Sequence, residues 1–508
     1  MSHPIDNSQR SNFPPHPHGQ ALIPEGSDIQ VDAGSFRDPG GFIFRKDGKI
    51  FRAIGQHSLE DWNCFSASPL FQDLQKDRLL IPTHAVAADV RSAFPEQAVG
   101  AGIAVVEHER VPFVSYPYEW PFGMLQDAAL LHLDILERCL SHDLILKDSS
   151  AFNVQYLGAR PIFIDVLSFA RLNPGEPWIG YNQFCKMFLF PLMLQAYKHV
   201  PFQSWLRSEL EGLDPATFSR LFGTLDLLRP GVFMHVYLQA LMQKRLAAAR
   251  TSVRSKIKAA GLPKCLIVNN LRGLRRVIRK LKVKAGDSTW ADYTQTHSYS
   301  DAGMQQKEDF VRQIVAGRKH RLVWDLGCNV GQFSRVAAEH ADYVVAMDAD
   351  QVTVEALYRN LRKERCQNIL PMVMDLANIS PRQGWAGSER QSLPDRGKPD
   401  LALCLALIHH VVISANIPVE SFLAWLAGLG TSLIIEFVDK DDPMVRQLLL
   451  NKDDAYDAYS RPSFESCLRQ FFCVERSLAP PASAAFTMPP RIPAHQPCVK
   501  KFEKIPMP

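Results

Sequence analysis

The chain has 508 residues, which is long for one hydrophobic core and predicts two folded units. Hydrophobic residues make up 46% of the chain and charged residues 22%, the balance of a globular protein with large buried cores. A net charge of +4 over this length is too small to indicate nucleic acid as the main partner. The longest apolar run, at 187–194, falls far short of the roughly 20 residues that cross a bilayer, so we expect no transmembrane segment.

The first 30 residues are rich in Pro, His, Ser and Asn and show no periodic apolar face, which predicts a disordered tail at 1–30. They also lack the basic start and the apolar stretch of a signal peptide. The ten cysteines include no C-x-x-C pair, and we interpret them as reduced core thiols of a cytoplasmic protein.

A first folded unit is expected at 31–249. Two β-rich runs at 40–54 surround Asp47 and Gly48, a pair typical of a hairpin turn. The segment 123–142 then places apolar residues along one helical face, and helical patterns continue to about 249. These patterns predict an α+β unit.

The segment 250–285 is strongly basic, with twelve Lys and Arg and no Asp or Glu between Arg250 and Lys284. Five apolar residues share one helical face, and they are Leu271, Leu274, Val277, Ile278 and Leu281. The segment is therefore predicted to be a basic amphipathic linker helix that packs its apolar stripe on a domain. A helix that lies on anionic lipid or RNA is the alternative.

Short apolar runs alternate with helical patterns from 286 to 478, and these runs are RLVWDL, YVVAMD, ILPMVM, DLALCLAL and SLIIEF. Such alternation predicts a doubly wound α/β domain, whose parallel sheet is covered by helices on both faces. The segment 479–508 is Pro-rich and is predicted to be a C-terminal tail, because no clear final strand is visible in SAAFTMPPRIPAH.

The first apolar run leads into DLGCNVG at 325–331, and ligands of open α/β sheets bind beyond the carboxyl ends of the strands. Dinucleotide enzymes place G-x-G-x-x-G at this turn, against a pyrophosphate. Here three residues separate Gly327 from Gly331, and Asp325 precedes both. A carboxylate at this point suits a ligand with an ammonium and a sulfonium better than one with phosphates. We expect the glycines to let the backbone approach that ligand.

Two further acids follow at strand ends. Asp348 closes the second run, seventeen residues after Gly331, at about the distance where an acid takes ribose hydroxyls. Asp375 ends the third run. Three carboxylates at three successive strand ends would surround a cationic nucleoside without phosphate, which predicts S-adenosylmethionine as the cofactor.

These residues resemble the class I S-adenosylmethionine-dependent methyltransferases, which have a Rossmann-like doubly wound fold. The resemblance covers about 286–478, where WADYTQTHSY, LIIEFVDKDDPMV and YDAYSRPSFESCL look like the methyltransferase half of nodulation-type proteins. It implies a cofactor site formed by Asp325, Gly327, Asn329 and Gly331 of the first motif, Asp348 at the ribose, Asp375 beside the adenine, and Leu405 in PDLALCLALIHH.

Methyl transfer is an in-line displacement, so placing the acceptor against the methyl carbon supplies much of the rate. If the acceptor is a hydroxyl, His409 or His410 after the fourth run is a candidate base, and Glu436 at the neighbouring strand end would orient one of them. Packed, hydrogen-bonded histidines are the alternative. A flap over the cofactor is expected from Trp290, Tyr293, Tyr299 and Lys307.

The first unit carries a rival pattern in LILKDSSAFNVQYLGARPIFID, where Asp148, Asn153 and Asp165 look like the catalytic and metal loops of kinase-like phosphotransferases. The His-Arg expected before the catalytic Asp and the glycine-rich phosphate loop are missing. The unit is therefore interpreted as kinase-like or accessory.

We thus expect a methyltransferase that acts on a small-molecule or glycan-like hydroxyl and uses no metal. One alternative is a bifunctional protein whose first unit is a phosphotransferase that uses ATP and magnesium. An RNA methyltransferase is the other alternative; the basic segment favours it, whereas no RNA-binding module and no N/D-P-P-Y type motif is recognisable.

Overall fold

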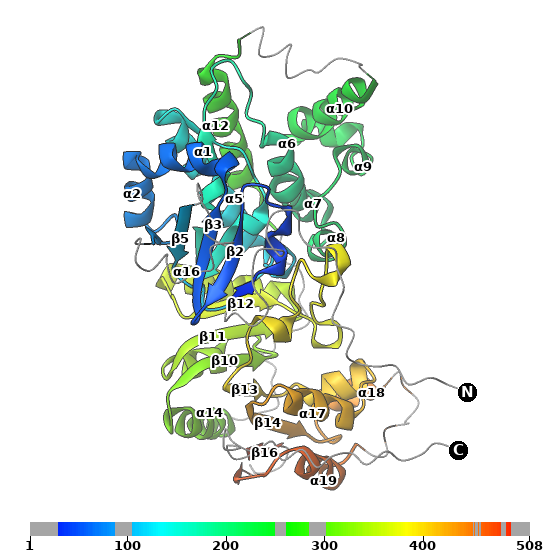
Figure 1. Ribbon diagram of the computed structural model, residues 1–508. Helices are drawn as coiled ribbons and strands as arrows, with labels where there is room; N and C mark the ends of the chain where they lie inside the picture. Colours follow the sequence, from blue (N-terminus) through cyan, green and yellow to red (C-terminus); the bar gives the residue numbers. More distant parts are fainter. Residues whose placement is uncertain are drawn as a thin grey trace, which may run out of the picture.

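The computed structural model describes residues 29–86, 104–248, 261–283, 301–450, 452, 456, 459–478 and 484–488. It shows two units, one above the other in Figure 1. The tail expected at 1–30 lies outside the described residues except for its last two, and so do Trp290, Tyr293 and Tyr299 of the expected flap.

The N-terminal unit opens with a five-stranded antiparallel sheet in the order β1-β2-β3-β5-β4. Its strands are β1 Gln30–Val31, β2 Gly41–Lys46, β3 Lys49–Ile54, β4 Thr83–Ala85 and β5 Ala104–His108. The predicted hairpin is confirmed as β2 and β3, which pair around Asp47 and Gly48. Both turn residues have positive φ, 50° and 75°, as the tightest hairpin turn requires.

The predicted helix at 123–142 is α5, Phe122–Ser141, and the residues of its apolar face, Leu125, Ala129, Leu133, Leu136 and Leu140, are buried. Two short antiparallel pairs follow it and interrupt the expected helical stretch: β6 Leu144–Leu146 with β9 Phe169–Arg171, and β7 Val154–Leu157 with β8 Arg160–Phe163. The other helical elements before 249 are η2 Ala33–Arg37, α1 Gln56–Ser66, α2 Pro69–Lys76, η3 Pro117–Glu119, η4 Ala151–Asn153, η5 Val166–Ser168, α6 Tyr181–Phe184, η6 Cys185–Leu189, α7 Phe190–Lys198, α8 Gln203–Ser208, α9 Pro215–Ser219, η7 Thr224–Leu228, η8 Val232–Tyr237 and α10 Leu238–Ala248.

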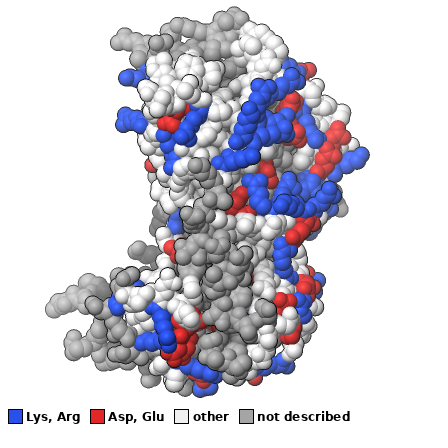
Figure 2. Space-filling view, turned by 180° about the vertical axis from the view of Figure 1, so that it is seen from behind, with Lys and Arg blue, Asp and Glu red and all other residues white. Residues whose placement is uncertain are grey.

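The basic segment contains α12, Lys264–Lys280, which packs against α5 and so belongs to the N-terminal unit. Its apolar stripe is buried except for the half-buried Val277, and Gln126 of α5 donates to the carbonyl of Ile278 at 2.8 Å. Glu137 of α5 forms an ion pair with Arg275 at 2.5 Å. Lys and Arg side chains gather on the back of this unit with acidic side chains among them (Figure 2). The prediction of a helix that packs its apolar stripe on a domain is confirmed, whereas 250–260 and 284–285 lie outside the described residues.

The C-terminal unit contains a seven-stranded sheet in the order β12-β11-β10-β13-β14-β16-β15. The strands are β10 His320–Leu326, β11 Ala341–Asp348, β12 Ile369–Val373, β13 Leu401–Cys404, β14 Ser432–Val438, β15 Arg476–Leu478 and β16 Ala484–Met488. The five predicted runs form β10 to β14, and neighbouring strands among them pair in parallel. The predicted doubly wound parallel sheet is confirmed.

A final strand does exist beyond 478. β16 pairs antiparallel with both β14 and β15, so it completes the sheet inside the segment predicted to be a tail. The expectation of no strand in SAAFTMPPRIPAH is wrong, because pairing with two neighbouring strands outweighs the weak strand pattern of this Pro-flanked segment. The sheet therefore extends to Met488.

Helices connect the strands of the C-terminal sheet. Because parallel crossovers are right-handed and the strand order runs in opposite directions on the two sides of β10, the connecting helices fall on opposite faces. The helical elements are α14 Asp301–Ala316, α15 Gln332–Ala338, α16 Gln351–Glu364, η9 Leu376–Asn378, η10 Trp385–Gly387, η11 Leu393–Arg396, η12 His410–Ser414, α17 Val419–Gly428, α18 Pro443–Leu449 and α19 Arg461–Phe471.

The two units share one hydrophobic core. A single cluster of buried apolar side chains runs from Ile54 in the N-terminal unit to Phe472 in the C-terminal unit. The rings of Phe113 and Trp324 meet edge to face across the boundary, with centroids 6.2 Å apart. The two units are thus joined by buried apolar contacts. Pulling the units apart would expose these apolar side chains to water.

None of the nine described cysteines is in a disulfide. Four are buried, but Cys265 and Cys473 are exposed, so the expectation of core thiols is wrong for these two. Of the helices in the described ranges, none has the length and apolarity needed to cross a membrane.

Candidate active site

The predicted site residues gather at the carboxyl ends of β10, β11, β12, β13 and β14. The strand order reverses between β10 and β13, and this reversal opens the crevice in which α/β sheets bind ligands. Asp325 lies on β10, Asp348 ends β11, Asp375 follows β12, His409 and His410 follow β13, and Glu436 lies on β14. The parallel register therefore brings together acids that are far apart in the sequence.

The glycine turn between β10 and α15 is held by backbone hydrogen bonds. The amides of Gly327 and Cys328 both donate to the carbonyl of Met347, at 2.8 and 2.9 Å. Gly327, Asn329 and Gly331 have positive φ of 77°, 49° and 81°, a conformation that suits glycine and that asparagine tolerates. The turn is thus tied to the end of the neighbouring strand.

The space beside each glycine of the turn is filled by a leucine side chain. A Cβ at Gly331 would lie 2.6 Å from Leu357 Cδ1 of α16, and one at Gly327 would lie 3.0 Å from Leu407 Cδ1. A close approach of the backbone to the ligand at these two glycines stays a prediction. Their missing side chains let α16 and the segment after β13 pack against the turn.

Asp325 is a buried carboxyl at the base of the crevice, only 2% exposed. Ser334 Oγ, on α15, donates to its Oδ2 at 2.5 Å. Burial raises the pKa of Asp325 from 3.8 to about 6; the charge of Asp348 adds to this rise, and the Ser334 hydrogen bond and the Lys307 charge oppose it. Within the described part of the chain, no Lys or Arg forms an ion pair with this carboxyl.

Among the described residues, Asp348 accepts hydrogen bonds from backbone amides alone. The amide of Asn329 donates to Oδ2 at 2.8 Å and that of Asp350 to Oδ1 at 2.9 Å. Burial nevertheless raises the pKa of Asp348. Beside it, the side-chain oxygen of Asn329 is buried and has no hydrogen-bond partner among the described residues, so it is an acceptor available to a ligand donor.

Asp375 and Leu405 mark two other edges of the crevice. Asp375 is exposed and accepts from the amide of Ala377 at 2.9 Å, which caps η9. Leu405 is buried directly after β13. The next residue, Ala406, has a positive φ of 49°, which is rare for alanine and marks a strained turn at this strand end.

Glu436 is part of a buried ion pair. Lys307 Nζ of α14 donates to Glu436 Oε2 at 2.7 Å, and both side chains are buried. The same oxygen accepts from the amide of Ala406 at 2.7 Å. Glu436 therefore holds both the strained turn at Ala406 and the buried Lys307. That Glu436 also orients a histidine, and that Lys307 belongs to a flap, stay predictions.

His409 and His410 lie side by side with ring centroids 4.1 Å apart. Burial lowers the pKa of His409 to about 3, helped by His410 and Lys307, and lowers the pKa of His410 to about 4. Both rings are therefore neutral at pH 7. Because a general base works best when its pKa lies near the operating pH, these values make either histidine a weak base.

No model of a known protein family matches the sequence. The chain is, however, 34% identical over 440 residues to the nodulation protein NoeA of Rhizobium meliloti (strain 1021), a match that covers 86% of this chain and 91% of NoeA. The chain belongs to the NoeA family. Because 440 residues exceed the length of either unit, the likeness to NoeA includes parts of both.

Three solved structures each align with 37 to 40% of this NoeA-family chain. The N-methyltransferase NodS from Bradyrhizobium japonicum WM9 matches 38% of this chain and 98% of its own, at 10% identity and a TM-score of 0.28. The magnesium protoporphyrin IX methyltransferase ChlM from Synechocystis PCC 6803, with bound SAM, matches 40% of this chain and 84% of its own, at 19% identity and a TM-score of 0.26. The bifunctional kinase-methyltransferase WbdD matches 37% of this chain and 40% of its own, at 18% identity and a TM-score of 0.27. Likenesses this low carry no argument about function.

The kinase-like residues of the N-terminal unit do lie together. Asn153 Nδ2 donates to Ser168 Oγ at 3.1 Å, and Ser168 Oγ donates to Asp165 Oδ2 at 2.5 Å. Burial raises the pKa of Asp148, and the charge of Asp165 adds to it. Asp165, however, is paired with the buried Arg52 of β3 at 2.6 Å.

That ion pair changes what the kinase-like residues can do. A phosphotransferase needs the second carboxylate to hold magnesium. Here Arg52 neutralises Asp165 and also pairs with Asp38. Among the described residues, no group of three or more His, Cys, Asp or Glu side chains is arranged to hold a metal ion.

The sequence did not lead us to three contacts of the site. These are the hydrogen bond from Ser334 to Asp325, the ion pair of Lys307 with Glu436, and the hydrogen bond from the Ala406 amide to Glu436. Ser334 had a readable signal, because a hydroxyl in the first turn of the helix after a glycine turn lies near the preceding strand end. The pairing of Lys307 with Glu436 had none, since 129 residues separate them.

Proposed function

We propose that this NoeA-family chain is a methyltransferase that binds S-adenosylmethionine at the carboxyl end of its parallel sheet. The observation that carries the proposal is a pair of carboxyls on neighbouring parallel strands, the buried Asp325 and the half-buried Asp348. Each is held by neutral donors, and each has its pKa raised by burial. A site of this kind gains from a ligand that brings positive charge.

The free acceptors of the site fit the polar groups of such a cofactor. Asp348 keeps lone pairs for two ribose hydroxyls, Asp325 and the side-chain oxygen of Asn329 suit the ammonium end, and Asp375 suits an adenine amino group. When bound, the sulfonium supplies an activated methyl group. The glycine turn and the buried Leu405 would then border the bound cofactor.

The residues of the chain then position the acceptor rather than deprotonate it. His409 and His410 are too weakly basic to carry much general-base catalysis, whereas alignment of acceptor and methyl carbon needs no enzyme base. His409 Nδ1 is a buried group without a hydrogen-bond partner among the described residues, which suits a contact with the acceptor. We keep a small or glycan-like hydroxyl as the proposed acceptor.

The basic segment supports that choice over RNA. The apolar face of α12 is used for packing on α5, and Lys264 and Arg275 pair with Asp143 and Glu137. Part of the positive charge that would attract a phosphate backbone is thereby neutralised.

The test is calorimetric titration of the full chain with S-adenosylmethionine and S-adenosylhomocysteine. Asp348→Ala should weaken both by about 1.5 to 3 kcal/mol, because charge-assisted hydrogen bonds are lost. Asp342→Ala is a matched control at the other end of β11, where Asp342 is exposed and pairs with Lys319. No heat with the wild type, or equal losses in the two variants, would exclude this site.

A further inference from the structure

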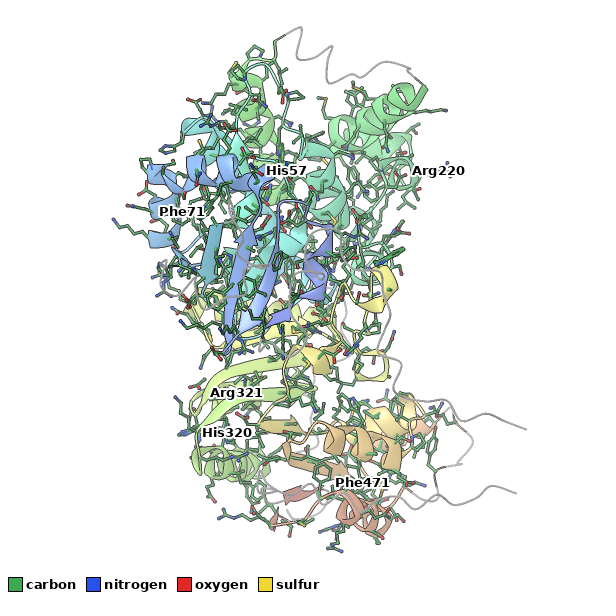
Figure 3. The ribbon with its side chains drawn as sticks, viewed as in Figure 1. His57, Phe71, Arg220, His320, Arg321 and Phe471 are labelled. Carbon is green, nitrogen blue, oxygen red and sulfur yellow. The ribbon has the colours of Figure 1, made fainter. Side chains whose placement is uncertain are left out.

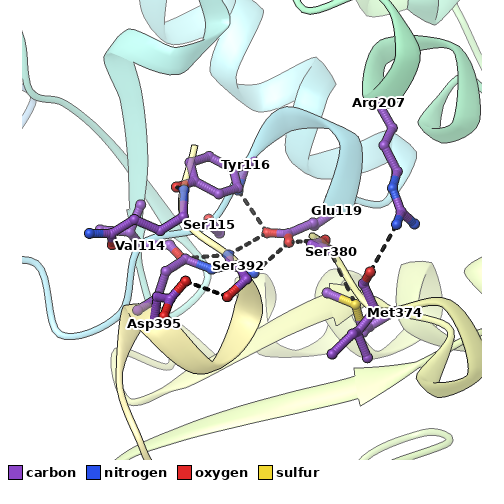
Figure 4. Close-up of polar contacts among 12 residues, drawn as sticks. Val114, Ser115, Tyr116, Glu119, Arg207, Met374, Ser380, Ser392 and Asp395 are labelled. Atoms are coloured by element: carbon purple, nitrogen blue, oxygen red, sulfur yellow. Dashed lines mark hydrogen bonds and ion pairs between the residues drawn. The ribbon is translucent and has the colours of Figure 1, made fainter. Parts of the chain in front are cut away.

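A buried polar junction joins the N-terminal unit to the segment between β12 and β13. The carboxylate of Glu119, in η3, accepts from Arg396 Nη2 at 2.6 Å and from Arg396 Nη1 at 2.7 Å. It also accepts from Ser380 Oγ at 2.5 Å and from the amide of Tyr116 at 2.9 Å (Figure 4). The side chains of Arg396 and Glu119 are 0% and 1% exposed.

Aromatic rings and a carbonyl complete the surroundings of Arg396. Its guanidinium lies 4.8 Å from the ring centre of Tyr116 and 5.2 Å from that of Phe113, and Nη1 donates to the carbonyl of Val114 at 2.8 Å. Removing one charge from such a desolvated pair costs far more than removing a surface pair. The segment that carries Arg396 is therefore fixed to the N-terminal unit.

Arg207 of α8 holds the same segment closer to β12. Its Nη1 donates to the carbonyl of Asn378 at 2.9 Å, and its Nη2 donates to the carbonyl of Ile379 at 2.8 Å and to the side-chain oxygen of Asn378 at 3.1 Å. In return, Gln383 donates to the carbonyl of Arg207 at 2.8 Å. These contacts begin three residues after Asp375.

The N-terminal unit also holds the helix that follows Asp348. The amide of Gly123 in α5 donates to Glu355 of α16 at 2.6 Å, and Tyr358 of α16 donates to Asp127 of α5 at 2.6 Å. Gln195 of α7 donates to Gln351, the first residue of α16, at 2.8 Å. The contacts thus reach the two segments that follow Asp348 and Asp375, which are the acids assigned above to the ribose and the adenine.

We propose that the N-terminal unit is the positioning body for the adenosine side of the cofactor site, with Arg207 and Glu119 as its positioning residues. This inference rests on the proposed function, because it assumes that Asp348 and Asp375 face adenosine. Arg207 restrains the exposed stretch after Asp375, and Glu119 anchors its far end through Ser380 and Arg396. The unit therefore contributes to cofactor affinity without touching the cofactor.

The test uses the full chain and two ligands that share adenosine. S-adenosylhomocysteine and 5′-methylthioadenosine are titrated calorimetrically into wild type, Arg207→Ala and Arg207→Lys. Residues that act through a restrained segment typically change affinity about 2- to 30-fold. Arg207→Ala should weaken both ligands by a factor in this range and by the same factor, because the defect concerns the part they share. Arg207→Lys should recover part of the loss, because it keeps one donor.

Two further variants separate positioning from folding. Arg220→Ala is the matched control, since Arg220 is an exposed arginine after α9 at the outer edge of the N-terminal unit (Figure 3). It should leave both affinities within about twofold. Ser380→Ala removes one hydrogen bond to Glu119 and should weaken both ligands with little change in the thermal midpoint.

The two proposals fail in different ways. A wild type that binds neither ligand removes the proposed function and this inference with it. A wild type that binds both, with unchanged affinities for Arg207→Ala and Ser380→Ala, overturns this inference alone. A loss for S-adenosylhomocysteine without a loss for 5′-methylthioadenosine also overturns it, because the defect would then lie on the amino-acid side.

Discussion

Replacing Asp325 by Asn should stabilise the ligand-free protein at neutral pH while it weakens cofactor binding. Burial raises the pKa of this carboxyl from 3.8 to about 6, so the folded protein keeps a proton that the unfolded chain has already lost. The protonated Asp325 carboxyl contributes its full stability below about pH 3.8, and this contribution is lost as the pH rises through about 6. A shift of about two units corresponds to about 3 kcal/mol above that pH.

Asn removes this cost because it is neutral at every pH and still accepts the hydrogen bond from Ser334. Thermal unfolding of the two ligand-free proteins between pH 4 and 8 measures the effect. The midpoint of Asp325→Asn should exceed that of wild type at pH 7.5, and the difference should fade towards pH 4. Calorimetry at pH 7.5 should show weaker binding of S-adenosylmethionine to the variant, because its positive charge then faces a neutral amide.

The same experiment can refute the reasoning. A midpoint difference that is constant over the whole pH range would show that the carboxyl does not titrate near pH 6. Equal cofactor affinities would show that its charge does not face the ligand. Asp342→Asn, at the exposed start of β11, is the control for a carboxyl whose replacement should leave both measurements almost unchanged.

Three other predictions follow from the packing of charged and small residues. Gly331→Ala should lower stability by about 1 to 3 kcal/mol, because its Cβ meets a leucine of α16 at 2.6 Å; an unchanged thermal midpoint would contradict this. Glu436→Gln should cost about 3 to 5 kcal/mol, because it removes the carboxylate charge that faces the buried Lys307 ammonium, and adding Lys307→Met should recover much of it in the same assay. Titration with magnesium-ATP should give no heat, because Arg52 occupies Asp165; heat that Asp165→Asn abolishes would instead indicate a phosphotransferase.

The parallel sheet and its acids were predictable from the sequence because their signals are local. Each of β10 to β14 is a short apolar run, and Asp325, Asp348 and Asp375 stand at or near the ends of theirs. Once a parallel sheet is inferred, all its carboxyl ends meet at one edge, so the acids had to converge. The hairpin at Asp47 was equally local.

What the sequence did not reveal depends on contacts between distant segments. β16 has a weak strand pattern and is defined by its pairing with β14 and β15. The partner of Glu436 is 129 residues away, and the leucine that a Cβ at residue 331 would meet lies on another helix. The low pKa values of His409 and His410 could not be predicted from the sequence either, because burial in the folded protein causes them.

The distance along the chain between Glu119 and Arg396 has a consequence for biosynthesis. The two residues are 277 positions apart. At about 5 to 20 residues per second, a ribosome needs roughly 15 to 55 seconds to travel from one to the other. During that time the nascent N-terminal unit displays a carboxylate and an apolar surface that the finished protein buries, so chaperones and aggregation compete for it. The arginine that pairs with Glu119 emerges only after β10, β11 and β12, so a chain truncated before Arg396 would leave the Glu119 carboxylate without that partner.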